Sequence, residues 1–427
     1  MKDFFKAGFY RLMFQGFNFL AGLFIAAISG AEVFGTISLM IVNAAFLHLL
    51  TGLGADQAIV WHGAAKKFQP NKLFTFTFFT ALFQVLLFLF ITIIFFYTTG
   101  KTLLSKNLSV NYFYYELIYF TGLVLLDKYV SLLYAEHRAG ICSLLLTVVT
   151  GAALLVLIAV RFHFFSITID PFIFFCLLVL AQAIAVLLLF HSKTKVFFTA
   201  FTRHDIDSFF RFSIVVFVTN IIQFIAYRAD FWLIDYFSYS KDQLGIYAQA
   251  NRFAGLLWIA PNIIAALLAP LISRPGSNFK ENELAGITRM FNCINLAAAG
   301  LIIFISFVIY TVFLQPVYFY GFTSLLYMLP GFYFFSITLL LAAYFSAKNL
   351  LWINLAASSI CFVIIITADF LLIPGWGIKG AAIANTIAYT LSSLFTIIMF
   401  LRVSNLGIAG LFSFQKSDWK LITKLQS

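Results

Sequence analysis

Charged residues are scarce in this sequence. They make up 10% of its 427 residues, whereas a soluble globular chain usually carries about 25%. So few charges cannot cover a water-exposed surface, which argues against a soluble enzyme, a disordered chain and a nucleic-acid-binding module. Hydrophobic residues account for 63% of the chain and aromatic residues for 19%, and the mean hydropathy is +1.00. The composition therefore predicts an all-α polytopic integral membrane protein.

Motifs for catalysis and for metal binding are missing as well. The four cysteines and six histidines show no metal-ligand or redox spacing. There is no Walker lysine motif, which argues against ATP hydrolysis by this chain. The connections predicted on the outer side are too short to carry the catalytic groups of a membrane glycosyltransferase or polysaccharide polymerase. The sequence thus predicts no enzyme, no cofactor and no metal.

The sequence contains long apolar runs without any charged residue. A membrane-spanning helix needs about 20 mostly apolar residues, and residues 73–100, 172–190 and 381–401 contain no charged residue. Residues 291–347 also lack charge, and Pro316 and Gly321 can form a turn inside them. Twelve spans are predicted, near residues 8–27, 35–53, 73–98, 112–134, 141–160, 171–190, 212–236, 244–271, 291–314, 324–345, 352–373 and 377–401.

The placement of the basic residues predicts the topology. Most of the 27 Lys and Arg residues fall in the segments that lie inside if the N-terminus is inside. Cytoplasmic segments carry such an excess. With an even number of spans, both termini are predicted on the same side of the membrane, in the cytoplasm. The net charge of +11 is then a topology signal, and no nucleic-acid partner is predicted.

The twelve spans divide into two groups of six. The longest polar connection, 191–211, separates a predicted N-terminal bundle (1–190) from a C-terminal bundle with a cytoplasmic tail (212–427). Matched positions at one constant separation, Gly35 with Gly245 and Arg138 with Lys348, favour two halves related by a pseudo-two-fold axis along the membrane normal. Repeat halves with a binding site between them are a common transporter plan.

Charges inside predicted spans are the candidate functional groups. A charge in the hydrocarbon costs roughly 2.5–3.5 kcal/mol on insertion scales and is retained mostly beside a partner or a water-filled cavity. The candidates are Arg11, Glu116, Asp127, Lys128, Arg228, Asp230, Asp235, Arg252 and Asp369.

The basic candidates have both structural and functional interpretations. Arg11, Gln15 and Asn18 share one helix face, so Arg11 either reaches the inner headgroups or lies at a cavity mouth. Arg228 and Arg252 either pair with acids, Arg228 with Asp235 on one face, or form an anion site, because guanidinium groups bind phosphate oxygens bidentately.

The remaining candidates are Lys128 and four acidic residues. Lys128 either extends to the headgroups or faces a cavity. Asp127, Asp230, Glu116 and Asp369 are candidates for ion or proton coupling, since burial can raise the pKa of a carboxylate. We expect Glu116 and Asp369 to lie near outer helix ends, where water reaches them.

Three sequence pieces carry a family resemblance. The first is Leu371-Leu-Ile-Pro-Gly-Trp-Gly-Ile-Lys-Gly-Ala-Ala-Ile-Ala-Asn-Thr386; the second is Asp230 with Leu244-Gly-Ile-Tyr247 and Ala269-Pro270; the third is Gly35-Thr-Ile-Ser38 with Leu53-Gly54. Together they resemble the multidrug/oligosaccharidyl-lipid/polysaccharide exporter superfamily. Within it the chain is most similar to the Wzx-type flippases of O-antigen and related polysaccharide pathways. Asp369 stands where that family often has Asn.

The resemblance implies a substrate and a mechanism. A polyprenyl-pyrophosphate-linked oligosaccharide would move from the cytoplasmic to the periplasmic leaflet by alternating access, with ion coupling. Its pyrophosphate would meet a cationic cavity between the halves, formed by Arg11, Gln15, Asn18, Lys128, Arg228 and Arg252. Implied partners are this lipid-linked substrate, membrane lipids, and polysaccharide polymerase and chain-length proteins.

Two alternatives remain open on the sequence alone. A cation-coupled multidrug exporter of the same superfamily also has twelve spans, and its cavity should favour acids over arginines. A membrane enzyme of polysaccharide assembly would need larger outer loops than this chain has.

Overall fold

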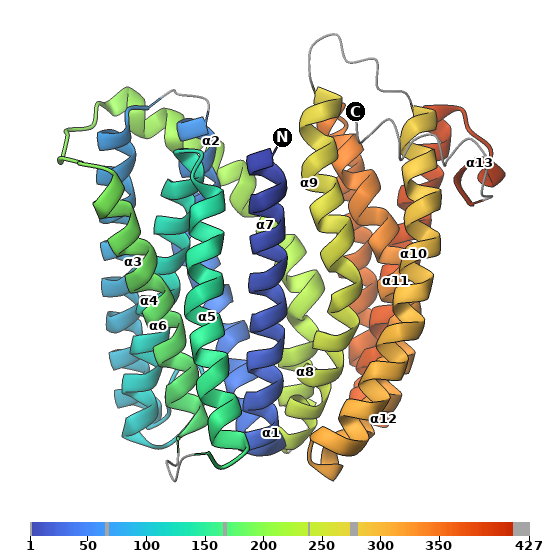
Figure 1. Ribbon diagram of the computed structural model, residues 1–427, viewed down its shortest axis with the longest axis horizontal. Coiled ribbons are helices and arrows are strands. Elements are labelled where there is room, and N and C mark those ends of the chain that lie inside the picture. Colours follow the sequence, from blue (N-terminus) through green and yellow to red (C-terminus); the bar gives the residue numbers. More distant parts are fainter. Residues whose placement is uncertain (1, 65–67, 165–168, 238–239, 274–280, 413–427) are drawn as a thin grey trace. The chain divides into compact units, whose positions relative to one another are not determined.

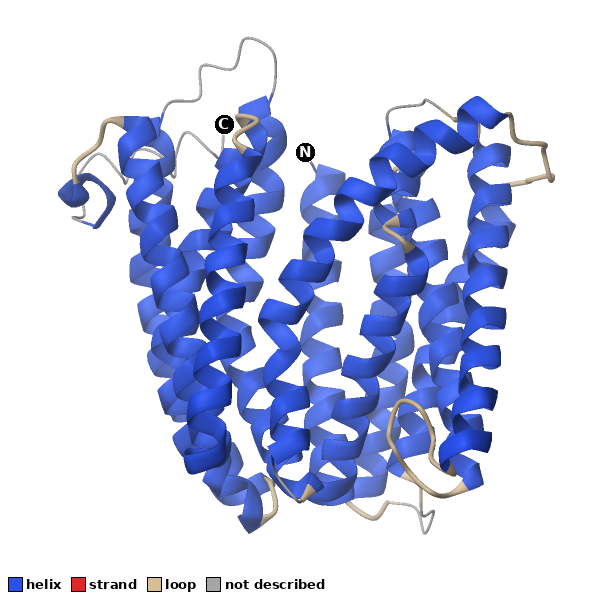
Figure 2. Cartoon of the chain, turned by 180° about the vertical axis from the view of Figure 1, so that it is seen from behind, coloured by secondary structure: helices blue, strands red, loops and turns tan. Residues whose placement is uncertain are grey.

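The computed structural model describes residues 2–64, 68–164, 169–237, 240–273 and 281–412. Within these ranges the chain forms helices joined by short loops, and no strand occurs there (Figure 2). The helices are α1 (Lys2–Gly52), α2 (Ala55–Ala64), α3 (Pro70–Thr99), α4 (Val110–Ala135), α5 (Ala139–Arg161), α6 (Pro171–Lys193), α7 (Arg203–Phe237), α8 (Lys241–Gly255), α9 (Ile259–Ser273), α10 (Glu281–Val308), α11 (Phe319–Ala347), α12 (Leu351–Ser404) and α13 (Ile408–Phe412). Short helical turns at Leu256–Trp258, Ile309–Phe313 and Pro316–Tyr318 complete them.

Nine helices of the described chain are long and apolar enough to cross a membrane. Two of them are about twice the length that one crossing needs: α1 has 51 residues and α12 has 54. Each is bent at a glycine with non-helical dihedral angles, Gly30 (φ 77°, ψ 175°) and Gly377 (φ 54°, ψ −135°). The predicted spans 8–27 and 35–53 are the two arms of α1, and 352–373 and 377–401 are the two arms of α12. With α8 and α9 joined as one crossing, the all-α fold with about twelve crossings is confirmed.

Several predicted boundaries need correction. The ten-residue helix α2 was not predicted. The span expected at 212–236 begins earlier, at Arg203, because α7 continues through the polar segment before it. Of the predicted connection 191–211, only residues 194–202 lie outside helices.

The chain forms two compact units, Met1–Phe224 (unit 1) and Ile225–Ser427 (unit 2), so the division falls inside α7. In unit 1, α1 packs on α5, and α4 packs on α3 and α6 (Figure 1). A Cβ at Gly122 would lie 2.9 Å from the backbone nitrogen of Leu180, so this glycine allows α4 and α6 to touch. In unit 2, α11 packs on α8, α9 and α12, and Gly331 allows the same close approach, since its Cβ would lie 2.5 Å from Cα of Thr386.

Helix α3 shows how the bilayer shapes the side-chain pattern. Its outward face carries large exposed apolar side chains such as Phe79, Phe83 and Phe90, whereas Thr77 and Gln84 are fully buried on the opposite face. A polar side chain in a span is stable when it faces the protein interior. Apolar exposure with polar burial is therefore what a lipid-facing helix requires.

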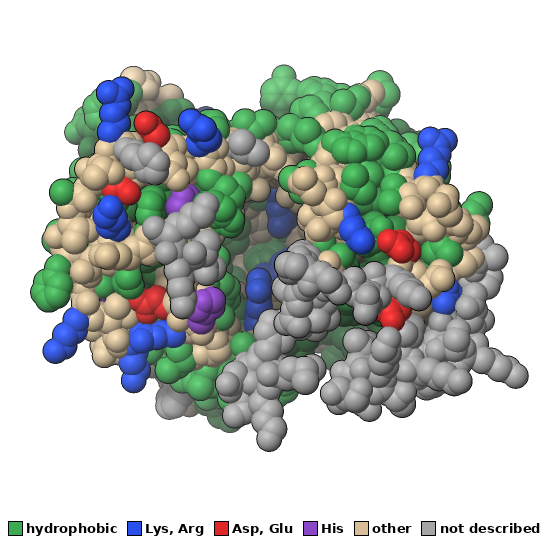
Figure 3. Space-filling view, turned by 90° about the horizontal axis from the view of Figure 1, so that it is seen from above, with side chains coloured by type: hydrophobic (Ala, Val, Ile, Leu, Met, Phe, Trp, Pro, Cys, Tyr) green, Lys and Arg blue, Asp and Glu red, His purple; other side chains and the backbone are tan. Residues whose placement is uncertain are grey.

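Basic side chains gather at one end of each unit. In unit 1, Lys72, Arg138 and Lys193 lie at the helix ends near the N-terminus. Several Lys and Arg side chains are visible among the described residues in the view of Figure 3. In unit 2, Arg289 and Lys348 lie at one end, where Lys348 is 3.8 Å from Glu281. Lys66, Lys67, Arg274, Lys280, Lys416, Lys420 and Lys424, which also entered the topology prediction, lie outside the described residues.

Candidate functional site

Unit 1 contains a cluster of four charged side chains from three helices. His48 is on α1, Asp56 on α2, and Asp127 and Lys128 are adjacent on α4. The Nε2 atom of His48 lies 3.3 Å from Asp56 Oδ2 and 3.2 Å from Asp127 Oδ2. Lys128 Nζ lies 2.9 Å from Asp56 Oδ1. We refer to these residues as the unit 1 charge cluster; its two carboxylates face two basic groups.

Lys128 is the most deeply buried member of the charge cluster. Its side chain is 0% exposed, so it does not extend to the headgroups, contrary to that interpretation of the sequence. Burial by itself would raise the pKa of Asp56, but the ammonium of Lys128 and the imidazole of His48 outweigh it and hold the pKa of this carboxyl well below its ordinary value. Asp56 is therefore ionised at neutral pH, and Lys128 is its counter-ion.

An amide and a small pocket complete this region. Gln84 Nε2 donates to the backbone oxygen of His48 (3.1 Å) and to Thr51 Oγ1 (3.1 Å). A pocket of about 320 Å³ reaches the cluster, lined among others by Asp56, Asp127 and Tyr134. The side chain of Asp127 is 46% exposed, so water can reach this carboxylate.

A sharp turn brings Asp56 into the cluster. Gly54 (φ 75°) lies between α1 and α2, and a Cβ there would lie 2.5 Å from the backbone oxygen of Ser213 on α7. Only glycine fits such a contact in this conformation. Asp56 was not among the sequence candidates because it lies just beyond a predicted span. His48 lies inside a span but was not selected, because a single histidine in an apolar run is more often a packed core residue than a proton relay.

Glu116 belongs to a different and purely local arrangement. Its Oε1 accepts from the backbone N–H and the hydroxyl of Ser105 (2.7 and 2.6 Å), and its Oε2 accepts from the backbone N–H of Leu104 (2.9 Å). The side chain is fully buried, so the expectation that water reaches it is wrong. The carboxylate instead holds the loop between α3 and α4 closed over the helix end.

The predicted polar stripe on α1 is present. The opposite side of this helix packs on α5, where Thr147 donates to the backbone oxygen of Tyr10 and Phe17 covers Gly151. Arg11 and Asn18 are exposed, and Gln15 is half-buried with its Oε1 atom inaccessible to solvent. The three residues thus share a face that α5 does not cover.

Unit 2 holds a buried polar network around Asp230. The hydroxyl of Tyr247 on α8 donates to Asp230 Oδ2, and Asn385 Nδ2 on α12 donates to the same oxygen at 3.0 Å. The backbone N–H of Phe231 donates to Asp230 Oδ1 at 2.9 Å. All three side chains are fully buried. We refer to Asp230, Tyr247, Asn385 and Asp369 as the unit 2 acid network.

Asp369 joins this network through its charge. It lies on the first arm of α12, on a buried face with Cys361, Ile365 and Ile373, and it interacts electrostatically with Asp230. Its side chain is fully buried, so the expectation of water contact is wrong here too. Among the described residues, neither carboxylate oxygen of Asp369 has a hydrogen-bond partner, and neither does Asn385 Oδ1.

The network unites the sequence pieces that carried the family resemblance. Asp230 and Tyr247 come from the second piece and Asn385 from the first. Sequence reasoning singled out Asp230 and Asp369 by their charge and missed Tyr247 and Asn385, although both stood inside the quoted motifs. Their position within the motifs was the signal that could have identified them.

The two candidate arginines of unit 2, Arg228 and Arg252, are half-buried. The guanidinium of Arg228 lies 5.4 Å from the ring centroid of Phe231 and acts electrostatically on Asp230. Arg252 interacts electrostatically with Tyr318. Asp235, the expected partner of Arg228, forms an ion pair with Lys241. The guanidinium of Arg228 thus lies over an aromatic ring.

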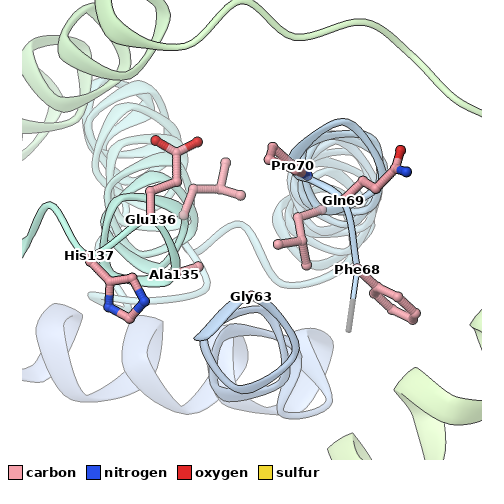
Figure 4. Close-up of a pocket in the computed structure, with 9 residues that line it drawn as sticks. Gly63, Phe68, Gln69, Pro70, Ala135, Glu136 and His137 are labelled. Atoms are coloured by element: carbon pink, nitrogen blue, oxygen red, sulfur yellow. The ribbon is translucent and has the colours of Figure 1, made fainter. Parts of the chain in front are cut away.

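A larger pocket of about 620 Å³ opens where α2 and α4 end and α3 begins (Figure 4). Its walls include Phe68, Pro70 and Leu132. Its carboxylate, Glu136, is 3.3 Å from Arg138 and accepts a hydrogen bond from Thr194 Oγ1. With that charge already paired, the pocket carries no functional assignment.

Metal chemistry finds no support in these arrangements. Across the described ranges, no group of three or more His, Cys, Asp or Glu side chains is arranged to hold a metal ion.

Comparison with known proteins places these observations in a family context. Residues 9–275 match the family described as "Polysaccharide biosynthesis protein". No curated protein sequence is significantly similar to the chain. The structure of a lipid II flippase, MurJ, in an inward closed conformation is similar with a TM-score of 0.71 and 18% identity, covering 99% of this chain and 95% of that one.

Two further solved structures share the fold. A multidrug resistance MATE family transporter of the MOP superfamily is similar in its inward-facing conformation, with a TM-score of 0.68 and 13% identity over 93% of this chain and 98% of that one. A structure of such a transporter in the outward-facing conformation is similar with a TM-score of 0.65 and 14% identity. The similarity covers 95% of this chain and 96% of that one. The described chain therefore shares its fold with membrane transporters whose structures were solved in two conformations.

Proposed function

Because the chain belongs to the polysaccharide biosynthesis protein family, we propose that it is a flippase for a polyprenyl-pyrophosphate-linked oligosaccharide, an O-antigen, capsule or similar repeat unit. It carries this lipid from the cytoplasmic to the periplasmic leaflet of a bacterial inner membrane by alternating access, and it makes and breaks no bond. The family match over residues 9–275 is the observation that carries the proposal. The similar fold of a lipid II flippase supports it.

The proposed topology has both termini in the cytoplasm. The basic residues at the N-terminal end of unit 1, such as Lys72, Arg138 and Lys193, support this orientation, because cytoplasmic ends of spans are rich in Lys and Arg. Polysaccharide polymerase and chain-length proteins, which would take over the delivered repeats, are the proposed protein partners.

We assign the substrate pyrophosphate to Arg11, Arg228 and Arg252, helped by Gln15 and Asn18. Guanidinium groups stay charged and bind phosphate oxygens bidentately. The exposed stripe on α1 supports the role of Arg11. Lys128 drops out of this set because its ammonium is buried against Asp56.

We assign ion or proton coupling to Asp230 and Asp369. Two buried acids that repel each other favour uptake of a proton or a monovalent cation, which removes part of that repulsion. The oxygens of Asp369 and Asn385 that lack a hydrogen-bond partner among the described residues support this assignment. Asp127 and Glu116, the other coupling candidates, already have His48 and the N–H groups of residues 104–105 beside them.

Deletion of the gene in its host tests the function. Lipid extracts of the deletion strain should accumulate polyprenyl-pyrophosphate-linked oligosaccharide while surface polysaccharide disappears, and the wild-type gene should restore both. Unchanged lipids combined with new drug sensitivity would replace the flippase with a multidrug exporter. Accumulation of an incomplete repeat, together with turnover by the purified protein alone, would indicate an enzyme of polysaccharide assembly.

Complementation with variants tests the pyrophosphate assignment. Arg11→Gln, Arg228→Gln and Arg252→Gln should each fail to restore surface polysaccharide at wild-type protein levels. Lys241→Gln is the matched control, since it removes a basic residue of unit 2 that pairs with Asp235. Full complementation by all three arginine variants would rule out this substrate site and leave the function itself standing.

A further inference from the structure

One hollow in unit 2 is distinct from both charged regions. It has a volume of about 580 Å³ and lies where α8 and α11 begin and α12 bends. That volume is within the range of roughly 300–1,000 Å³ found for small-ligand pockets. Its lining includes Gln243, Tyr320, Tyr327, Trp376, Lys379 and Ile383. We refer to it as the aromatic hollow.

The walls of the aromatic hollow are held firmly. The positive φ of Gly377 bends α12, and a Cβ at Gly380 would lie 2.4 Å from the backbone oxygen of Leu372, so the two arms of α12 touch backbone to backbone. On the other wall, the hydroxyl of Thr386 donates to the backbone oxygen of Tyr327, which ties α12 to α11. The aromatic rings are therefore presented from a rigid frame.

The rings themselves remain uncovered. Tyr320 is 69% exposed, Trp376 60% and Tyr327 45%. Burying such rings against a ligand gains both apolar contact and the attraction of the negative ring face for partly positive hydrogens. Gln243 adds an amide that can donate and accept, and Lys379 adds a charged donor.

A saccharide fits this combination of groups. A sugar ring has C–H faces, which stack on aromatic rings, and a rim of hydroxyl groups, which need donors and acceptors. Interfacial anchoring explains single Trp and Tyr side chains at helix ends. It does not explain why three of them line one hollow together with an amide and an ammonium group.

We propose that the aromatic hollow binds the sugar part of the transported lipid at the end of unit 2 where α12 bends. This inference rests on the proposed function and adds a saccharide site apart from the arginines assigned to the pyrophosphate. In the proposed topology the hollow lies on the periplasmic side, so it meets the oligosaccharide as the substrate is delivered.

Binding of free oligosaccharides tests the proposal without the lipid. The probe is the mixture of short oligosaccharides released by partial acid hydrolysis of the host's surface polysaccharide, added to the purified full-length chain in lipid nanodiscs. We expect Trp376→Ala and Tyr320→Ala to raise the Kd about tenfold, as truncation of a central aromatic contact does. Trp376→Phe, which keeps a ring, should bind within about threefold of wild type.

Trp352→Ala is the matched control, because Trp352 is 56% exposed and lies at the start of the arm of α12 that ends near Trp376, without lining the hollow. Its Kd should equal that of wild type. Equal binding by all variants, or no binding by the wild type, would overturn the hollow as a saccharide site. The lipid extracts of the deletion strain test the flippase function, and the binding assay tests the saccharide site. A negative result in one experiment therefore does not decide the other.

Discussion

Acidic side chains lie between the helices of both units, but their surroundings differ. In unit 1, Asp56 and Asp127 face Lys128 and His48, and Glu116 accepts hydrogen bonds on both oxygens. In unit 2, Asp230 accepts from Tyr247 and Asn385, which are neutral donors, and the described residues form no salt bridge to Asp230 or Asp369. A carboxylate paired with a basic group holds helices together, whereas one without a salt bridge gains from binding a proton or cation. We therefore propose a structural role for the carboxylates of unit 1 and a coupling role for those of unit 2.

Removing the counter-ion in unit 1 should have the largest effect. Lys128→Met keeps the length of the side chain but removes the ammonium beside Asp56 Oδ1, so that His48 is the basic partner left to this carboxylate among the described residues. We expect this change to cost about 3 kcal/mol of unfolding free energy. Denaturant titration of the purified protein measures it. Adding Asp56→Asn should restore most of the loss, because the under-compensated charge is then gone. Equal stability of Lys128→Met and wild type would contradict a structural pair.

The matching change in unit 2, Asp230→Asn, should affect transport more than stability. The new amide N–H₂ faces a donor on one side, so we expect a loss of about 2 kcal/mol of stability in a protein that still folds. Asp230→Asn keeps the size of the side chain and removes the charge, so we expect oligosaccharide delivery to fall on the order of 100-fold if coupling supplies the driving force. Pulse labelling of surface polysaccharide in the deletion strain measures the rate. Asp235→Asn, whose partner is Lys241, should stay near wild type. Delivery at the wild-type rate by Asp230→Asn would contradict the assignment of coupling to the unit 2 acid network.

Glu116 differs from Asp369 in its hydrogen bonds: both oxygens of Glu116 accept them, whereas among the described residues neither oxygen of Asp369 does. In Glu116→Gln, the side-chain amide has only one oxygen, which can accept from the backbone N–H of Leu104 or of Ser105 but not from both. Its N–H₂ group then faces the remaining backbone N–H, and two donors do not pair. We therefore expect a loss of about 2 kcal/mol of stability. Transport by the folded protein should continue. The thermal unfolding midpoint and the complementation assay separate these outcomes. Loss of transport at unchanged stability would make Glu116 a coupling residue.

The smallest effect is expected at the edge of the unit 2 network. Tyr247→Phe removes one donor to Asp230 and leaves Asn385 and the N–H of Phe231 in place, so we expect a loss of about 1 kcal/mol. Delivery should continue, with its pH dependence shifted because Asp230 has lost a donor that stabilises its charged form. A pH profile of delivery that matches wild type would show that Tyr247 has no part in coupling.

Much of the fold was predictable because the bilayer imposes simple rules. A span needs a run of apolar residues of fixed length, so the twelve crossings could be located. Two helices begin well before their predicted spans: α7 at Arg203 where 212 was predicted, and α10 at Glu281 where 291 was predicted. The bends at Gly30 and Gly377 separate arms that the sequence already marked as two spans each. The short helix α2 was missed because ten residues carry too little apolar periodicity to stand out.

The candidate sites were only partly predictable. Charge inside an apolar run marked Asp230, Asp369, Asp127 and Lys128, since the cost of burying a charge makes each one conspicuous. It could not say which of them have partners. Gln84, Tyr247 and Asn385 are neutral, so charge could not mark them. The motif positions of Tyr247 and Asn385 offered a signal, and Gln84 had none.

The sequence by itself determined that this protein spans a membrane about twelve times, where the crossings lie and which residues carry unusual charge, because these depend on local hydropathy and composition. Only the tertiary structure decided which charges neutralise each other. Asp56 meets Lys128 because the turn at Gly54 folds α2 back against α4, and Tyr247 and Asn385 meet Asp230 across three helices. Such contacts depend on how helices distant in sequence pack, and no local pattern encodes them.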